Sequence, residues 1–280
     1  MRKGAEAPLE QDQYIKPKGI CQEPMFKEVP TFDKAYTDQV HEWRKQFETY
    51  IASKQLTIAP FTDEDTEAVI AFLHRRYPQH VAQETSAFNL FMYREYGHGA
   101  ILKEPGSGKV VGTVFEMSMN TADKTSFTHR LAIDASYEGK NLGYHLMMYS
   151  CLLAMEKVSM IKRGIIQIGN LRSLHINLNK VGWVADGFEH ISTLGDFVRI
   201  AIPLNLRGLT SNVIDQEKLM QFIHTHQEGK DYRMVPAMDV EAIQSLFQLP
   251  ERYKIVSMLK ADTYRPEPMF LAVPNAFMQA

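Results

Sequence analysis

The residues with the clearest chemical potential lie between Leu131 and Leu146. Leu131 to Ile133 has the character of a strand, Glu138 to Gly143 forms a short glycine-bearing loop, and an amphipathic helix is expected to begin there. The first N–H groups of a helix have no partner within the helix, and the helix dipole adds positive character to them. The stretch therefore predicts an anion site at the start of the helix. An ordinary strand-to-helix turn without a ligand is the alternative.

The loop resembles motif A of the GNAT superfamily of N-acetyltransferases, in which a strand is followed by Arg/Gln-x-x-Gly-x-Gly/Ala. The same register here contains Glu138-Gly-Lys-Asn141-Leu-Gly143. Asn141 replaces the middle glycine, and asparagine tolerates left-handed backbone angles better than most residues. Glu138 replaces the usual Arg or Gln, which places a carboxylate near a pyrophosphate, and Lys140 could offset that charge.

The resemblance implies that the loop holds the pyrophosphate of acetyl-coenzyme A or another acyl-coenzyme A, used as a co-substrate. The amides of the first helical turn would bind the phosphates, and the pantetheine arm would follow the preceding strand. The residues implied in this binding are Leu131, Ala132, Ile133, Gly139, Lys140, Asn141, Leu142, Gly143, Tyr144 and Asn170.

The elements around the loop follow the order of the GNAT core. Two strands, 112–119 and 127–133, precede the loop, and the polar segment 120–124 can connect them as a hairpin. After the loop we expect a helix with apolar residues at helical spacing, a strand, a second helix closed by a glycine, and further strand broken near Gly195. These elements cover Leu142–Leu153, 164–168, 170–181 and 188–204.

A second resemblance lies in the helix that follows the strand 164–168. The segment from Asn170 to Gly182-Trp183 is similar to GNAT motif B, and its Gly-Trp end matches the usual Gly-Phe. Asn170 is one residue out of register. The position four before the glycine, usually a tyrosine that protonates the departing thiolate, is Leu178, so the obvious general acid is missing.

The fold class implied is α/β, a GNAT-like mixed and splayed β-sheet flanked by helices, with extensions at both ends. Upstream, 56–70 is typical of a strand and a capped helix, and a helix at 83–96 and a strand at 100–103 complete the core. We therefore expect an acyltransferase core at 56–204, an N-terminal extension at 1–55 and a C-terminal α/β extension at 205–280.

The two extensions carry amphipathic elements but no motif. Residues 1–30 are rich in proline and mixed charges, which favours extended chain. A helix over 31–54 has an apolar stripe that should pack on the core: Phe32, Tyr36, Val40, Trp43, Phe47 and Tyr50. The C-terminal section predicts helices at 216–226 and 239–247, a strand at 253–259 and an apolar tail at 269–277. It could cover the acceptor side of the site or form a homodimer contact.

Composition excludes several classes of protein. The 280 residues carry a formal charge of −2 and no basic run, so nucleic acid is not an evident partner. Cys21 and Cys151 are the only cysteines, which fits a reducing compartment. The sequence has no signal-like start, no run long enough to span a membrane and no His/Cys/carboxylate spacing typical of a metal site. We expect a cytoplasmic protein without a metal.

Three residues are candidates for proton transfer. Glu116 lies on the strand 112–119, where many family members place a carboxylate; burial in a dry cleft could raise its pKa, or the side chain could face solvent. His129 shares a strand face with Leu131, and that face belongs to the core or to the cleft. His175, one helical turn from Leu178, is a candidate for the missing acid.

Three functions fit these features. The first is an N-acyltransferase that uses acyl-coenzyme A and a primary amine of a small molecule or peptide. The second is a synthase of N-acyl amino acid or homoserine lactone type that takes its acyl group from an acyl carrier protein, which Glu138 and Asn141 favour mildly. The third is a non-catalytic module that binds acyl-coenzyme A, which the missing tyrosine at Leu178 favours.

Overall fold

A computed structural model describes residues 34–77, 87–120, 124–157, 159–204, 216–263 and 265–276. Several expected features lie outside these residues. They are the proline-rich stretch 1–30, the apolar position Phe32, the first residues of the helix expected at 83–96, part of the hairpin connection 120–124, and Cys21.

The described strands form one ten-stranded sheet in the order β1-β2-β3-β4-β5-β7-β6-β9-β10-β8. Among its pairings only that of β4 with β5 is parallel, so the sheet is mixed. The strands are β1 (Thr57–Pro60), β2 (Gly97–Lys103), β3 (Val110–Asn120), β4 (Thr125–Ile133), β5 (Ile161–Gln167), β6 (Val184–Ile191), β7 (Gly195–Pro203), β8 (Arg233–Pro236), β9 (Tyr253–Leu259) and β10 (Met269–Pro274).

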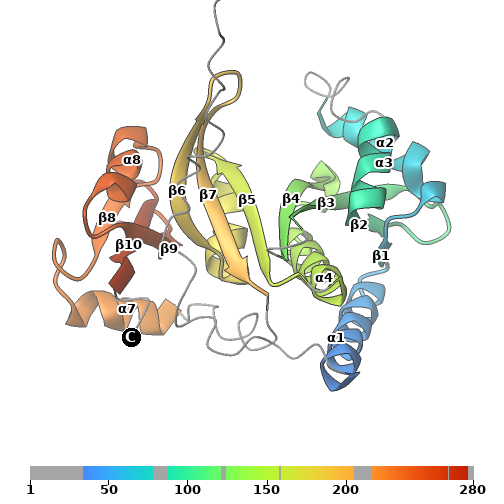
Figure 1. The fold of residues 1–280 in the computed structure, drawn as a ribbon, viewed down its shortest axis with the longest axis horizontal. Coiled ribbons are helices and arrows are strands. Elements are labelled where there is room, and N and C mark those ends of the chain that lie inside the picture. The colour runs from blue at the N-terminus through green and yellow to red at the C-terminus, as the bar shows by residue number, and fades with distance from the viewer. Residues whose placement is uncertain are drawn as a thin grey trace, which may run out of the picture.

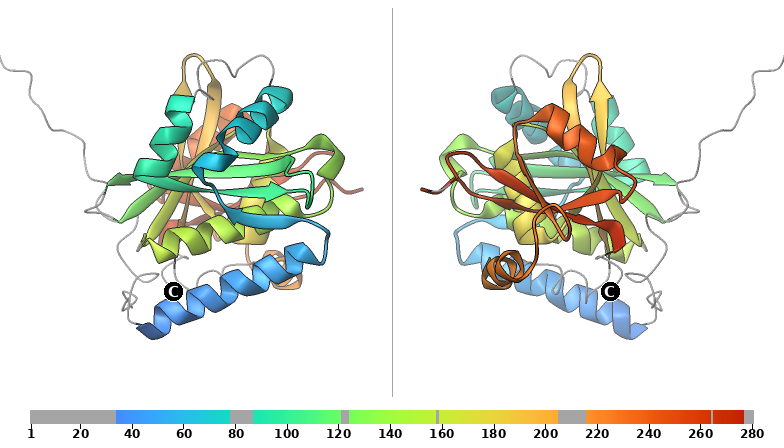
Figure 2. Two further views of the ribbon diagram at one scale, coloured as in Figure 1. Left: turned by 90° about the vertical axis from the view of Figure 1, so that its right-hand side faces the viewer. Right: turned by 90° about the vertical axis from the view of Figure 1, so that its left-hand side faces the viewer.

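Helices cover both faces of this sheet (Figures 1 and 2). α2 and α3 pack on β2 and β3 from one side, and α4, backed by α1, packs from the other. The described helices are α1 (Lys34–Ala52), α2 (Thr66–Arg76), α3 (Ala87–Tyr96), α4 (Leu142–Glu156), α5 (Leu171–His175) with the π-helical segment Ile176–Val181, α7 (Gln216–Thr225) and α8 (Val240–Gln248). The mixed β-sheet flanked by helices that the sequence predicts is confirmed.

The two central parallel strands separate soon after they meet. β4 and β5 pair only from Thr125 to Phe127 against Ile161 to Arg163, and they diverge beyond that point (Figure 1). A shift of register between β3 and β4 marks a bulge on β4, where Arg130 adopts a φ of 52°. A bulge bends the strand that carries it, so it directs the rest of β4 away from β5.

The helix after the glycine loop is more buried than expected. Thirteen residues of α4 are buried, although an amphipathic helix with one solvent face was expected. α1 explains the difference, because it covers the side of α4 that the sheet does not. Within the α1 stripe Val40 is fully buried and Trp43 and Phe47 pack on the core, while Tyr50 stacks on His145 with ring centroids 4.4 Å apart.

The C-terminal section continues the sheet of the core. β9 meets β6 at the single register pair Ala185–Ile255, and β10 and β8 follow at the edge. The expected helices and strand match α7, α8 and β9, whereas the short strand β8 was missed because its sequence Arg-Met-Val-Pro has no strand pattern of its own. The domain boundaries at 55 and 204 stay a prediction. None of the described helices is long and apolar enough to span a membrane.

Candidate functional site

A cleft lies where β4 and β5 part. Two cavities of about 580 and 740 Å³ adjoin there, and both are lined by Tyr77, Leu131, Asn170 and Ser173. The first cavity extends to the glycine loop and the start of α4. The second extends along β4 and β5 toward α3. The strand separation therefore creates one continuous cleft that crosses the middle of the molecule.

The loop at the start of α4 contains two residues with positive φ angles. Gly139 has a φ of 80°, and Asn141 has φ 61° and ψ 14°, which is the left-handed conformation. Asparagine is among the few non-glycine residues that adopt this region readily, so the expectation for Asn141 is confirmed. A Cβ at Gly143 would lie 3.0 Å from Ile176 Cδ1, so the first turn of α4 packs closely on the π-helical segment.

Positive charge surrounds this loop despite Glu138. Arg76 Nη2 lies 2.9 Å from Glu138 Oε1, and Arg172 forms an ion pair with the other carboxylate oxygen. Lys180 Nζ donates to Asn141 Oδ1 at 2.6 Å. Lys140, expected to offset Glu138, lies over the ring of Tyr137 instead. Two arginines therefore compensate the carboxylate, and the loop region keeps an excess of cations.

Most of the residues implied in binding the acyl donor line the first cavity. They are Leu131, Ala132, Ile133, Gly139, Asn141, Leu142, Gly143 and Asn170. The described lining does not include Lys140 or Tyr144. The side chain of Asn170 caps α5 by accepting from the Ser173 N–H at 3.2 Å, which accounts for an asparagine at the start of this helix.

His129 lines the second cavity from β4. Its ring lies between those of Tyr93 and Phe127, with centroids 5.5 and 5.0 Å away. Burial lowers the pKa of His129 below its ordinary 6.5, and the negative charge of Glu116 opposes this only in part. A neutral imidazole can accept a proton, and the catalytic role of His129 stays a prediction.

Glu116 lies on the opposite face of the sheet and does not line either cleft cavity. Its fully buried carboxylate contacts Lys162, Ser150 of α4 and His98. Burial alone would raise its pKa, but Lys162 and then His98 outweigh burial and lower the pKa to about 2. Both expectations for this side chain are therefore wrong. Glu116 does not lie in the cleft with a raised pKa, and it does not face solvent.

His175 lines the first cavity beside the loop, and Leu178 is fully buried in the core. Burial lowers the pKa of His175, and Lys260 and Lys180 lower it further. His175 is therefore mostly uncharged near neutral pH, which makes it a weak proton donor. Its role as the general acid stays a prediction.

Sequence reasoning missed the residues that complete the cleft from distant elements. Arg76 and Tyr77 come from the end of α2, and Arg172 and Lys180 come from α5 and the π-helical segment. The cluster of basic residues His74, Arg75 and Arg76 was the signal that could have indicated Arg76. Among the described residues, no three His, Cys, Asp or Glu side chains gather as a metal site would require.

No protein-family model and no curated protein sequence matches the chain. Solved structures similar to it include the ribosomal-protein-S18-alanine N-acetyltransferase of Escherichia coli, with 16% identity, TM-score 0.45, and coverage of 55% of this chain and 97% of that one. A GNAT-family acetyltransferase of Streptococcus pneumoniae has 16% identity, TM-score 0.46 and coverage of 54% and 99%. An N-acetyltransferase of Staphylococcus aureus has 18% identity, TM-score 0.44 and coverage of 54% and 99%. The likeness is one of fold alone.

Proposed function

We propose that this protein is an N-acyltransferase that moves an acetyl or other acyl group from acyl-coenzyme A to a primary amine of a small molecule or peptide. The observation that carries the proposal is the continuous cleft between β4 and β5. It has a cationic loop with left-handed Asn141 at one end and a half-buried, uncharged His129 at the other.

The loop end suits a diphosphate. The N–H groups of Leu142, Gly143 and Tyr144 begin α4 and have no acceptor within the helix. Lys180, Arg76 and Arg172 add positive charge around them. A hydrogen bond to a charged group contributes about 1.5–3 kcal/mol, so a few such bonds would hold a phosphate firmly. The edge of β4 from Leu131 to Ile133 then leads from the loop toward His129.

The His129 end suits proton transfer from an amine. A primary amine has a pKa of about 10 and is mostly protonated at neutral pH, so a base must take its proton before attack. His129 accepts that proton, the amine nitrogen bonds to the acyl carbon and releases a second proton to water, and the C–S bond to coenzyme A breaks. A thiol has a pKa of about 8.5, so the thiolate leaves without a strong acid and takes a proton from water. The buried leucine at position 178, where a tyrosine acid was expected, therefore does not prevent catalysis.

The same contacts bear on the two alternatives. Glu138 and Asn141 favoured a carrier-protein donor because they depart from the usual loop. Asn141 nevertheless has the left-handed backbone angles, and Arg76 and Arg172 neutralise Glu138, so neither departure argues against coenzyme A. A base inside the cleft favours catalysis over a purely binding role. A cytoplasmic location agrees with the buried free thiol of Cys151.

The test is an acyl-transfer assay with purified protein. Acetyl-coenzyme A is offered with a panel of primary amines (alkylamines, polyamines, amino acids and short peptides), and release of the free thiol is followed. We expect amine-dependent thiol release that the Gly143→Asp variant lacks. Binding of acetyl-coenzyme A without transfer to any amine would favour the non-catalytic module. Transfer only from an acylated carrier protein would favour the synthase.

A further inference from the structure

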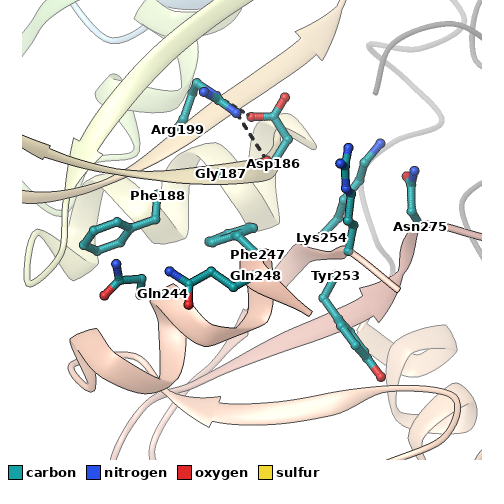
Figure 3. Close-up of a pocket in the computed structure, with 11 residues that line it drawn as sticks. Asp186, Gly187, Phe188, Arg199, Gln244, Phe247, Gln248, Tyr253, Lys254 and Asn275 are labelled. Carbon is teal, nitrogen blue, oxygen red and sulfur yellow. Dashed lines mark hydrogen bonds and ion pairs between the residues drawn. The ribbon is translucent and has the colours of Figure 1, made fainter. Parts of the chain in front are cut away.

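A separate cavity of about 340 Å³ lies at the seam between the core and the C-terminal strands (Figure 3). Residues of β6 and β7 line one side of it, and residues of α8 and β9 line the other. None of its described lining residues belongs to either cleft cavity. Its volume is at the lower end of the range of about 300–1,000 Å³ found for small-ligand sites.

The cavity exists because two strands meet only briefly. β6 and β9 share the single register pair Ala185–Ile255, so the strands part directly beyond it. A shift of register between Ala185 and Gly187 marks a bulge on β6 at the same place. A bulge changes the direction of the side chains that it carries, and here it places Asp186 against Arg199 (Figure 3).

Gly187 and Asp186 fix the position of the Arg199 guanidinium. Arg199 Nε donates to Asp186 Oδ1 at 3.0 Å, and Arg163 Nη1 lies 3.6 Å from the other carboxylate oxygen. A Cβ at position 187 would lie 2.5 Å from Arg199 Nη2, so any other residue there would displace the guanidinium. Asp186 is thereby neutralised by two arginines.

Two further cations enter the cavity from the start of β9. Lys254 is only 9% exposed, and Arg252 precedes it with a φ of 46°. Together with Arg199 they place three basic side chains in the lining, and the one acidic side chain there, Asp186, is in ion pairs. The remaining lining is uncharged and of two kinds, the amides of Gln244, Gln248 and Asn275 and the rings of Phe188, Phe247 and Tyr253. The cavity combines cations, amide groups and aromatic surface.

We propose that this cavity is a binding site for a small organic anion, a carboxylate carried on a short apolar body. Arg252 and Lys254 bind the carboxylate, because hydrogen bonds between two charged groups are stronger than those between neutral groups. Phe188 and Phe247 contact the apolar body. The guanidinium of Arg199, which Asp186 holds in place, adds a further hydrogen-bond donor on the β7 side of the cavity.

The experiment is calorimetric titration of the full chain with phenylacetate, succinate and inorganic phosphate. We expect saturable binding of phenylacetate at one molecule per chain, and unchanged binding when acetyl-coenzyme A is present. Arg252→Gln and Lys254→Gln should each weaken binding at least about tenfold, the loss expected for one charged hydrogen bond. Lys230→Gln, which removes an exposed lysine of the same section outside the cavity, should leave binding unchanged.

Thermal unfolding of each variant separates loss of the site from loss of the fold. Lys254 is buried and its replacement could unfold the chain, whereas Arg252 is exposed, so Arg252→Gln carries the test. Failure of both carboxylates to bind the wild type would overturn the proposal. Binding of phosphate alone, displacement of phenylacetate by acetyl-coenzyme A, or full affinity in a folded Arg252→Gln variant would overturn it equally.

Discussion

Lys162 and Glu116 form an ion pair in which both side chains are fully buried, and it joins β5 to β3 across β4. Lys162 also donates to Ser150 Oγ of α4 at 2.9 Å. Lys162 lies opposite Ser126, within the short stretch where β4 and β5 still pair. The ion pair therefore links β3 to β5 next to the point where β4 and β5 begin to separate.

Breaking this ion pair should be costly. Glu116→Met or Lys162→Met leaves an uncompensated buried charge, for which we expect a loss of about 3–5 kcal/mol in the free energy of unfolding. The double replacement by methionine removes both charges, so its loss should be smaller than the sum of the single losses. Urea unfolding of the three variants and the wild type checks this. Additive losses would show that the two groups do not depend on each other.

The same pair predicts how stability depends on pH. The pKa of Glu116 is lowered to about 2 in the folded protein from its ordinary 4.5. A lowered carboxyl pKa stabilises the fold above the unfolded value, and this stabilisation is lost as pH falls from about 4.5 toward 2. Urea unfolding between pH 7 and 3 should show a steeper decline in the wild type than in Glu116→Gln. If the stability of both proteins declined equally, Glu116 would not be the source of the pH dependence.

The sequence predicts the element order well because periodicity and glycine positions are local signals. Gly195 at the start of β7, with a φ of 97°, and Gly182 after the π-helical segment lie at the expected breaks. The pairing of β9 with β6 could not be predicted, because it joins residues 70 positions apart through one register pair, Ala185 with Ile255.

The site could be predicted only where its residues are close in sequence. The left-handed conformation of Asn141 follows from its residue type and its place in the loop. The partners of Glu138 could not be predicted in this way, because Arg76 and Arg172 lie 62 and 34 residues away in the sequence. Glu116 was misplaced because alternation along β3 gives two faces, and the sequence does not tell which face meets α4.

His129 should control the rate of acyl transfer. Loss of a general base lowers rates about 10²–10⁴-fold, so His129→Gln should lower kcat far more than it raises KM. The pKa of His129 lies below 6.5, so the ratio of wild-type to variant kcat/KM should be constant above about pH 7 and shrink in acid, where the imidazole is protonated. His74→Gln, at an exposed histidine of α2, is the control. A ratio independent of pH would contradict the assignment.

Removing Glu138 should strengthen donor binding. Its carboxylate occupies Arg76 and Arg172, so Glu138→Gln releases both guanidinium groups for phosphates. Partly exposed ion pairs contribute about 0–1 kcal/mol, so we expect a fewfold decrease in the Kd for acetyl-coenzyme A. Arg172→Gln should weaken binding by a similar factor. Calorimetric titration at low and moderate salt measures both, and weaker binding by Glu138→Gln would contradict the charge argument.

Substitutions at Gly143 test whether the start of α4 binds the phosphates. Gly143→Ala places a Cβ 3.0 Å from the flexible end of Ile176, so the variant should keep most of its affinity for acetyl-coenzyme A. Gly143→Asp adds a carboxylate beside the N–H groups at the start of α4, where it competes with a phosphate. We expect binding to be lost in the Asp variant only. Equal affinities in two folded variants would place the phosphates elsewhere.

The most direct test of the account is thermal unfolding of the wild type with and without coenzyme A, acetyl-coenzyme A and a long-chain acyl-coenzyme A. A ligand at about 100 times its Kd stabilises the native state by about 2.7 kcal/mol. For a chain of this size that corresponds to a rise in Tm on the order of 5–10 °C. The account predicts such a rise with acetyl-coenzyme A. An unchanged Tm with all three compounds would contradict the assignment of the cleft to coenzyme A.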